Sequence, residues 1–316
     1  MSAPADLDLV TFGEAMGLFL AADGRPLAAA TRFERQVAGA ELNVAVGLAR
    51  LGHRVGWFGR VGRDTAGALV RRTLRAEGID DSRVVEDPRR PTGLLVRDRH
   101  PERRIRVDYH RAGCAGGALH EDDVDRAYVA GARVLHVTGI TAALSPSARR
   151  ATFAAMQAAR DGGVTTVLDP NFRLKLWGPR AARPVLTALV ALADVVLAGV
   201  EEASLITGVA DREEAAARVH ALGPRTVVIK AGREGAWASD GDVAVAAPVR
   251  EVTMVDPIGA GDAFDAGFLS GVLRGEGLER CLELGAAVGA ARVQVPGDLD
   301  GLPTRAELED TVEVDR

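Results

Sequence analysis

The chain has 316 residues, of which 47% are hydrophobic and 26% charged, the proportions of a soluble globular protein. The 39 basic and 44 acidic residues leave a formal net charge of -5, which disfavours binding to nucleic acid through a basic surface. Two cysteines are too few for a disulfide framework or a cysteine-rich zinc site. The first ten residues contain neither a basic region nor an apolar run, and no stretch has the roughly 20 apolar residues of a membrane span. We therefore expect a cytoplasmic protein.

Short apolar, β-branched runs alternate with helical patterns along most of the chain. One helix should end at Leu51-Gly52, because glycine is a common helix stop, and the next should begin at Asp64-Thr65 and end at Gly78. Strands buried on both faces are continuous apolar runs, and such runs occur at 9–12, 54–58, 134–137, 164–168, 195–197 and 226–229. The alternation predicts an α/β fold, with a mostly parallel sheet covered by helices on both sides.

Two regions, 18–37 and 92–111, interrupt this alternation. Both combine short alternating strands with turn residues, and neither adjoins a helical pattern. We expect them to form a small β-layer that projects from the main sheet. Within the polar run 97–106, His100-Pro101-Glu102 should form a turn, which on the simplest interpretation is the solvated tip of a hairpin.

The segment 256–262, with the sequence DPIGAGD, precedes a helix with one apolar face. Small residues ahead of a helix leave backbone N–H groups pointing outward, so Gly259, Ala260 and Gly261 are candidates for an anion site. Asp262 beside them would repel a phosphate unless it accepts a proton from an attacking hydroxyl group. The simpler alternative is a helix start whose glycines serve packing and whose aspartate is a favourable first-turn acid.

Two segments that follow predicted strands are weaker candidates. The loop from Lys230 through Gly232 to Gly235 is compatible with nucleotide binding, and equally with a hairpin turn. Glu202 could hold a metal ion through water, although alone it is more typical of a surface glutamate at a helix start.

Two polar groups are candidates for binding the second substrate. The segment 169–177 begins at the carboxyl end of a predicted strand, the edge at which ligands bind in open α/β sheets. Tyr109 and Arg111 end the extra β-layer, and arginine binds carboxylates and phosphates with two parallel hydrogen bonds. Either group could instead form a surface ion pair. Because the sequence lacks a Walker A loop, a dinucleotide fingerprint and a zinc helix, the glycine-built anion site and its carboxylate indicate phosphoryl transfer.

Taken together, these residues resemble the ribokinase-like (PfkB) family of carbohydrate kinases over nearly the whole chain. The segment 259–262 is similar to the family's C-terminal signature. The stretch 38–45, followed by Leu51-Gly52 and by 59–64, is similar to its N-terminal signature. The two signatures together are specific to the family.

Within the family, the chain is most similar to kinases of 2-keto-3-deoxygluconate. The resemblance implies a Rossmann-type three-layer core as a single domain over 1–316, with a β-sheet lid from about 15–37 and 92–111. It implies transfer of the γ-phosphate of ATP to the terminal hydroxyl group of the sugar acid, with Mg²⁺ and no nucleic-acid or membrane partner. It also implies a homo-oligomer formed through the lid. The residues that carry this likeness are Gly13-Glu14, Tyr109-x-Arg111 and Asp169-Pro-Asn171-Phe-Arg173 with Leu176-Trp177.

The resemblance also assigns roles to individual residues. Asp262 would be the catalytic base, and the amides of Gly259, Ala260 and Gly261 would form the anion hole. The sugar acid would contact Gly39, Asn43, Tyr109, Arg111, Arg173 and Asp298. The nucleotide would contact Asn171, Gly199, Lys230, Gly232, Gly235, Gly259, Gly261 and Ala286, and Glu202 would hold the metal through water.

A monovalent cation is a further expected ion, although Pro257 and Ile258 replace two threonines that are common beside the anion hole. The alternative functions are a kinase of the same family for fructose, ribose or another deoxy sugar acid, a sugar sensor without turnover, and a structural component of an oligomer. The intact Asp262 argues against the sensor, because a carboxylate beside a phosphate site has no binding role.

Overall fold

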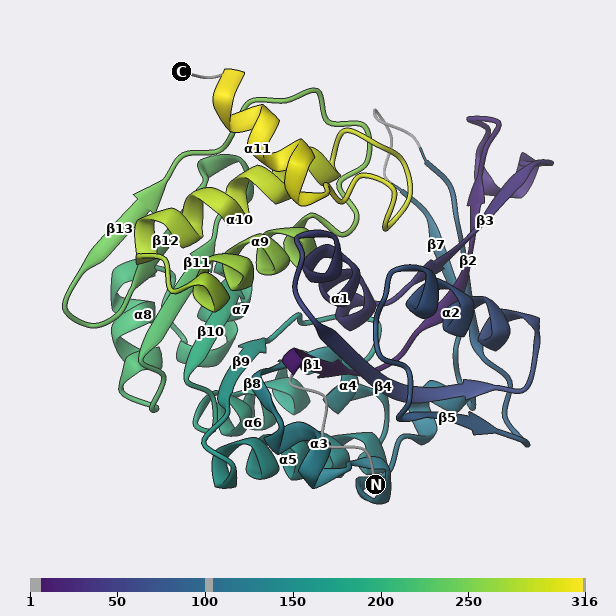
Figure 1. Ribbon diagram of the computed structural model, residues 1–316, viewed down its shortest axis with the longest axis horizontal. Coiled ribbons are helices and arrows are strands. Elements are labelled where there is room, and N and C mark those ends of the chain that lie inside the picture. The colour runs from purple at the N-terminus through teal and green to yellow at the C-terminus, as the bar shows by residue number, and fades with distance from the viewer. Residues whose placement is uncertain (1–6, 100–104, 315–316) are drawn as a thin grey trace.

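The computed structural model describes residues 7–99 and 105–314, so the expected turn at His100-Pro101-Glu102 lies outside the described residues. Within this part, a sheet of nine strands runs through the molecule in the order β13-β12-β11-β10-β9-β8-β1-β4-β5 (Figure 1). Its pairs from β11 to β5 are parallel, and β12 and β13 add antiparallel strands at one edge. The bounds are β1 Leu7–Phe12, β4 Val55–Gly62, β5 Val84–Asp87, β8 Ala132–Thr138, β9 Thr165–Asp169, β10 Val195–Gly199, β11 Thr226–Lys230, β12 Ala236–Ser239 and β13 Ala244–Ala247.

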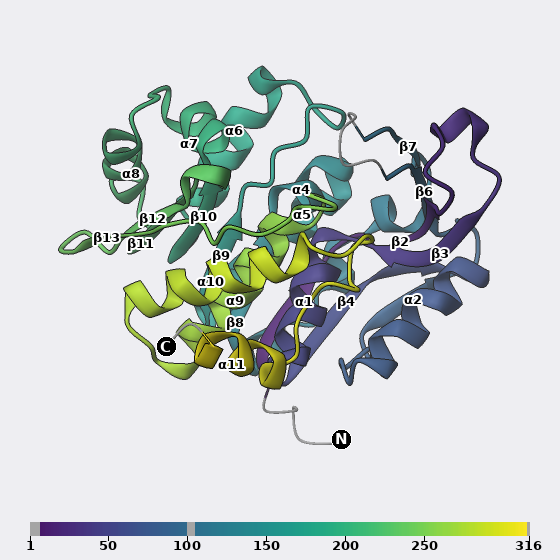
Figure 2. The same cartoon turned by 90° about the horizontal axis from the view of Figure 1, so that it is seen from above.

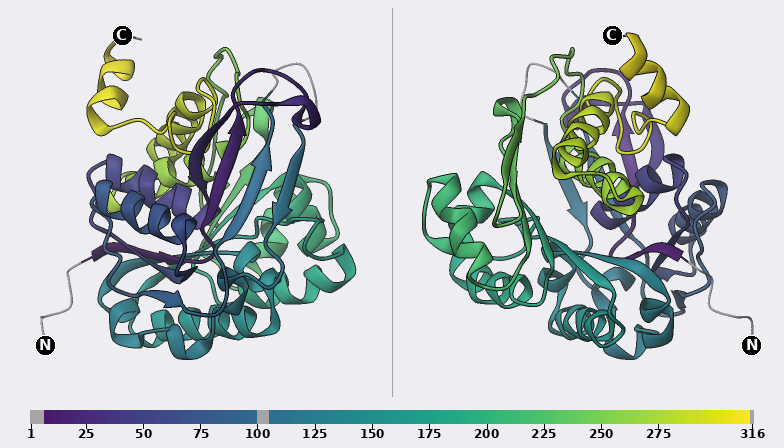
Figure 3. Two further views of the ribbon diagram at one scale, coloured as in Figure 1. Left: turned by 90° about the vertical axis from the view of Figure 1, so that its right-hand side faces the viewer. Right: turned by 60° about the vertical axis from the view of Figure 1, so that its left-hand side comes forward.

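Helices cover both faces of this sheet and bury two apolar cores (Figure 1 and Figure 3). The first core is formed with α1 Ala40–Arg50, α2 Thr65–Ala76, α9 Ala260–Arg274, α10 Leu278–Arg292 and α11 Arg305–Val314. The second is formed with α3 Arg126–Ala130, α4 Gly139–Leu144, α5 Pro146–Asp161, α6 Pro179–Val190, α7 Val200–Thr207 and α8 Arg212–His220. Short 3₁₀ turns occur at Leu27–Ala29, Ala115–Ala118, Glu121–Asp123 and Gly232–Glu234. The predicted three-layer α/β core is confirmed.

A second, smaller sheet forms the predicted lid. Its order is β3-β2-β6-β7, with β2 parallel to β6 and the other pairs antiparallel. Figure 2 shows these strands together at one side of the molecule, next to α2. The bounds are β2 Met16–Ala21, β3 Phe33–Ala38, β6 Gly93–Arg97 and β7 Val107–His110.

Three short strands at the edges of the large sheet, and the connection that follows β11, add detail that the sequence pattern does not show. The sequence pattern does not predict β5, β12 or β13, which are each four residues long. β11 and β12 pair antiparallel, with Lys230 opposite Ala236. The segment between them is therefore a hairpin connection, one of the two interpretations expected for it, and its contact with a nucleotide stays a prediction. The predicted helix start is confirmed, because the Asp64 carboxylate accepts a hydrogen bond from the Gly67 amide at 2.8 Å.

Glycines bring α9 and α10 into backbone contact. A Cβ atom on Gly267 would lie 2.4 Å from the Leu284 carbonyl oxygen, and one on Gly271 would lie 2.8 Å from Cys281 Sγ. Close packing of this kind fixes the axis of α9, whose first turn carries the anion-hole segment. Within the described part of the chain, none of these helices has the length and apolar character needed to cross a membrane.

Candidate active site

A cavity of about 880 Å³ lies at the carboxyl ends of β1, β9, β10 and β11, beneath the lid. Parallel strands end at one edge of their sheet, so residues that follow different strands converge there. Most of the predicted site residues line this one cavity: Gly39, Asn43, Tyr109, Arg111, Asn171, Arg173, Gly199, Glu202, Lys230, Gly232, Gly259, Ala260, Gly261, Asp262 and Asp298. Gly235 and Ala286 do not line it, because Gly235 closes the hairpin and Ala286 belongs to α10.

The carboxylate of Asp262 is held from two sides by asparagine amides. Asn43 Nδ2, from α1, donates to Oδ2 at 2.7 Å, and Asn171 Nδ2 donates to Oδ1 at 3.3 Å. Burial raises the pKa of Asp262, against the lowering effects of the Asn43 hydrogen bond and of Arg173. Desolvation is thus the largest influence on this pKa. A raised pKa makes the carboxylate a stronger base.

The anion-hole segment is built by a left-handed residue at the start of α9. Gly259 precedes the helix with φ 80°, a conformation that favours glycine. The Ala260 amide donates to the Pro257 carbonyl oxygen at 3.3 Å, whereas the described part of the chain offers no acceptor to the amides of Gly259 and Gly261. Two of the three predicted donors thus remain available to an anion.

A buried ionic group lies directly behind Asp262 and was not predicted. Lys230 Nζ donates to Asp169 Oδ2 at 3.0 Å and to Asp265 Oδ1 at 2.9 Å. Burial alone would lower the pKa of Lys230, but the two carboxylates raise it well above its usual value. Burial raises the pKa of Asp265, which follows Asp262 by one helical turn. The Lys230 ammonium group, paired with these carboxylates, therefore lies close to Gly261, whose Cβ position would be 3.8 Å from Nζ.

Asn171 adopts an unusual backbone conformation at this point. Its φ is 40°, and it is the single non-glycine residue of positive φ among the residues described. The Asp169 carboxylate accepts hydrogen bonds from the Asn171 amide N–H at 2.9 Å and from its side chain at 3.2 Å. Such strain persists where the surrounding contacts dictate it, and here it turns the Asn171 side chain toward Asp262.

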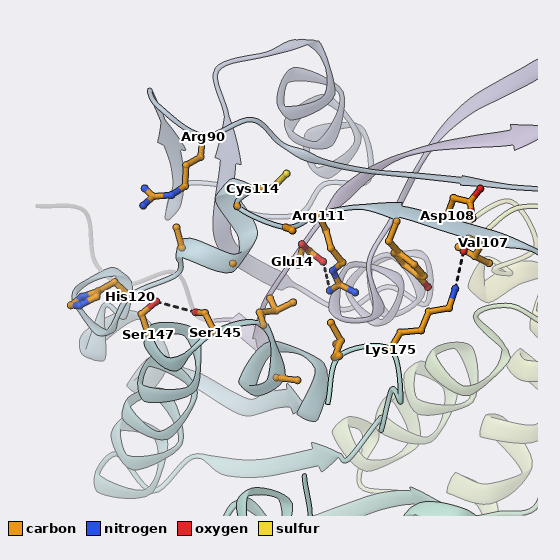
Figure 4. Close-up of a pocket in the computed structure, with 18 residues that line it drawn as sticks. Glu14, Arg90, Val107, Asp108, Arg111, Cys114, His120, Ser145, Ser147 and Lys175 are labelled. Atoms are coloured by element: carbon orange, nitrogen blue, oxygen red, sulfur yellow. Dashed lines mark hydrogen bonds and ion pairs between the residues drawn. The ribbon is translucent and has the colours of Figure 1, made fainter. Parts of the chain in front are cut away.

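On the lid side of the cavity, Arg111 has an ionic partner that the sequence does not indicate. Arg111 forms an ion pair with Glu14, which follows β1 and is almost completely buried. The Arg111 guanidinium also lies over the Tyr109 ring, 5.4 Å from its centroid. Glu14, Tyr109 and Arg111 line a second cavity as well, of about 970 Å³, where the Lys175 amine donates to the Val107 carbonyl oxygen at 2.8 Å (Figure 4).

Arg173 and Asp298 complete the acceptor side. Arg173 is exposed and uses Nη1 to donate to the Phe172 carbonyl oxygen at 3.1 Å, which leaves its other nitrogens for a ligand. Asp298 also lines the cavity, but its carboxylate accepts a hydrogen bond from Arg97 at 2.9 Å. The sequence indicated no partner for Asp298, because Arg97 lies about 200 positions away.

Glu202 is positioned by two backbone amides. Its carboxylate oxygens accept hydrogen bonds from the Gly199 and Phe172 N–H groups, both at 2.7 Å. Burial and the nearby Asp169 raise its pKa. Among residues 7–99 and 105–314, no three or more His, Cys, Asp or Glu side chains are placed so that they could hold a metal ion. Magnesium usually takes only one or two protein carboxylates and completes its shell with phosphate oxygens and water, so the lone Glu202 fits a water-mediated contact.

Comparison with known proteins assigns the chain to a family. A family model described as pfkB family carbohydrate kinase matches residues 6–305. The chain belongs to this family. The predicted PfkB family is thus confirmed, and so is the predicted enzyme class, a kinase that transfers phosphate to an alcohol group.

Individual PfkB relatives match this PfkB kinase over almost its full length. It is 40% identical to the 2-dehydro-3-deoxygluconokinase of Bacillus subtilis (strain 168), with 96% of this chain and 94% of that protein covered. It is 36% identical to the 2-dehydro-3-deoxygluconokinase of Thermoproteus tenax, with 98% and 95% covered. The crystal structure of a PfkB protein from Polaromonas sp. JS666 matches with a TM-score of 0.89 at 39% identity, covering 96% of this chain and 99% of that one. The ribokinase-like fold is confirmed.

Proposed function

We propose that the protein transfers the γ-phosphate of ATP to the terminal hydroxyl group of 2-keto-3-deoxygluconate, giving 2-keto-3-deoxy-6-phosphogluconate. The observation that carries the proposal is the meeting of Tyr109, Arg111 and Arg173 with Asp262 in one cavity. Two guanidinium groups and a phenol suit an acceptor that carries a carboxylate. The relatives that are 40% and 36% identical are named 2-dehydro-3-deoxygluconokinase, and 2-dehydro-3-deoxygluconate is another name for 2-keto-3-deoxygluconate. Their named activity supports the proposal.

In the proposed mechanism the acceptor binds between the sheet edge and the lid, with its carboxylate near Arg111 and Arg173. Asn43 and Asn171 hold the Asp262 carboxyl group so that an oxygen faces the terminal hydroxyl group. Asp262 accepts the hydroxyl proton while the oxygen attacks the γ-phosphorus in line and the bond to ADP breaks.

The donor side stabilises the charge of the transferred group. The amides of Gly259 and Gly261 at the start of α9 would donate hydrogen bonds to the transferred phosphoryl group, and Lys230, which is paired with Asp169 and Asp265, lies beside them. Mg²⁺ bound with ATP would neutralise phosphate charge, and Glu202 is the carboxylate that would hold it through water. We propose that Gly199 and Gly232 border the nucleotide at the same edge.

An acceptor panel tests the substrate. Purified protein is supplied with ATP, Mg²⁺ and one acceptor at a time: 2-keto-3-deoxygluconate, other deoxy sugar acids, fructose or ribose. We expect the highest kcat/KM for 2-keto-3-deoxygluconate, with the phosphate located on the terminal oxygen by NMR. A higher kcat/KM for fructose or ribose would reassign the acceptor. Repeating the assay with potassium exchanged for a bulky organic cation tests the monovalent ion.

A matched variant tests the role of Arg111. Replacing it by lysine keeps the charge beside Glu14 but removes the two-pronged hydrogen bonding, which contributes about 1.5–3 kcal/mol. We expect the R111K variant to raise KM for the sugar acid by roughly one to two orders of magnitude and to leave KM for ATP nearly unchanged. An equal rise in both constants would contradict a role in acceptor binding.

We also propose that the protein is a homo-oligomer assembled through its lid, and that it works in the cytoplasm. Phe33 on β3 is 40% exposed on the lid sheet, although it is a large apolar side chain. A partner lid would cover it. Light scattering at micromolar concentration should show at least a dimer, and a monomer would refute the assembly.

A further inference from the structure

Arg97, at the end of lid strand β6, reaches into the interior of the protein instead of solvent. Its side chain is 1% exposed. A single nitrogen, Nη2, donates to Asp256 Oδ2 at 2.8 Å and to Asp298 Oδ1 at 2.9 Å. Both carboxylates belong to segments outside the lid, so this nitrogen joins the lid to two loops of the core.

Asp256 organises the segment that carries the anion hole. Its Oδ1 accepts a hydrogen bond from the Ile258 amide at 3.1 Å, one residue before Gly259. Its Oδ2 accepts one from the Gly297 amide at 3.0 Å in addition to that from Arg97. The position of the Asp256 carboxylate therefore sets the entry of the chain into the first turn of α9.

A second buried arginine completes the group. Arg292 Nε donates to the Asp298 carbonyl oxygen at 3.0 Å, and its Nη2 lies 3.9 Å from Asp256 Oδ2. The same Nε would be 3.4 Å from a Cβ atom on Gly259, so the guanidinium lies directly beneath the anion hole. Two arginines and two aspartates balance in charge, and the loss of one leaves a buried charge uncompensated.

We infer that Arg97 is a positioning residue for phosphoryl transfer, which holds the anion-hole segment in place from the lid. This inference rests on the proposed kinase chemistry but not on the identity of the acceptor. Lid and anion hole must be correctly placed relative to each other, because the acceptor is bound by one and the phosphate by the other. A displacement of about 1 Å between reacting groups can cost on the order of 100-fold in rate.

The alternative is that the four charges only stabilise the fold. Lysine at position 97 distinguishes the two roles, since it preserves the buried charge but its amine stops roughly 1 Å short of the position of Nη2. The Arg97→Met variant removes the charge altogether. Gln36→Ala is the matched control, because Gln36 Nε2 on β3 donates to Asp300 Oδ2 at 2.8 Å, a second bond from the lid to the same loop in which Asp256 takes no direct part.

The experiment measures kcat, both KM values and melting temperature for wild type, R97K, R97M and Q36A, with rates taken well below the lowest melting temperature. We expect R97K to melt within a few degrees of wild type but to lose about tenfold in kcat. R97M should lose more than R97K in both kcat and melting temperature, and Q36A should keep kcat within twofold of wild type. If R97M does not fold, R97K alone decides the question. A kcat of R97K within twofold of wild type would overturn the inference, as would an equal loss in Q36A.

A binding measurement separates this inference from the choice of acceptor. The anion-hole segment should contact the γ-phosphate, so R97K should weaken binding of a non-hydrolysable ATP analogue severalfold more than binding of ADP. This ratio is measured by calorimetry without any acceptor. If the sugar acid proves to be the wrong substrate, the ratio and the kcat comparison on the true acceptor still apply. Equal weakening of both nucleotides would contradict the inference.

Discussion

Replacing Asp262 by asparagine removes the proposed base while preserving its size. The structure limits how the new amide can be placed, because both carboxylate oxygens face asparagine Nδ2 donors, Asn43 at 2.7 Å and Asn171 at 3.3 Å. The amide nitrogen of the variant should turn toward Asn171, where the hydrogen bond is longer, and one bond is lost. We expect turnover to fall by about 10²–10⁴, the range of general-base catalysis.

The expected change in stability is small because two contributions oppose each other. The lost hydrogen bond costs about 1 kcal/mol. The variant also no longer buries a charge whose pKa burial has raised, which stabilises the fold by a similar order. We expect the melting temperature to move by only a few degrees. ATP should bind as tightly as to wild type or slightly tighter, because one negative charge beside the phosphate site is gone.

The assay measures turnover, nucleotide affinity and melting temperature on one preparation across a pH series. Wild-type turnover should rise with pH as Asp262 ionises, with its midpoint above the ordinary 3.8 of an aspartate, whereas the residual turnover of D262N should lack this dependence. Retention of more than about a tenth of wild-type turnover by D262N would place the base elsewhere. Unfolding of the variant would favour the structural interpretation of this helix start.

Two other carboxyl groups give predictions of different kinds. Burial raises the pKa of Glu41 from 4.5 to about 7, so its contribution to stability is complete below pH 4.5 and is lost as pH rises through 7. The E41Q variant should therefore gain on the order of 3 kcal/mol in unfolding free energy relative to wild type between pH 5 and pH 8, and denaturant titrations at both values should reveal it; a constant difference would refute the assignment. The E202Q variant should need about tenfold more Mg²⁺ for half-maximal rate, because glutamine can accept only one of the two amide bonds that orient Glu202. An unchanged magnesium titration would exclude Glu202 from metal binding.

The parts of the fold that rest on local periodicity could be predicted from the sequence. The strand from Thr226 and the helix that begins after Asp64 were recognised because apolar runs, caps and glycine stops are encoded within a few residues. The edge strands β5 and β13 were not recognised, because each is four residues long and only half-buried. Their conformation depends on the neighbouring strand more than on their own residues.

The candidate site follows the same division. Asp262 and the glycines before it stand together in the sequence, so their chemistry could be interpreted directly. Asp265 was not singled out, since its meaning depends on Lys230 and Asp169, which approach it only when three strand and helix ends meet. Glu14 is a comparable case. The sequence draws attention to it after the first strand, but does not indicate that it pairs with Arg111 on the lid. Ion pairs between distant segments leave no periodic signal.

The two lysines of the chain differ in a way that offers a practical handle. Lys230 is held protonated between carboxylates and should resist amine-directed reagents, whereas Lys175 is exposed and lies over the Tyr109 ring at 5.2 Å. Apart from the α-amino group, such a reagent at modest pH should therefore attach to one position. A dye placed there would sit beside Tyr109, on the wall shared by the two cavities. Its fluorescence would report acceptor binding in real time, without introducing a cysteine.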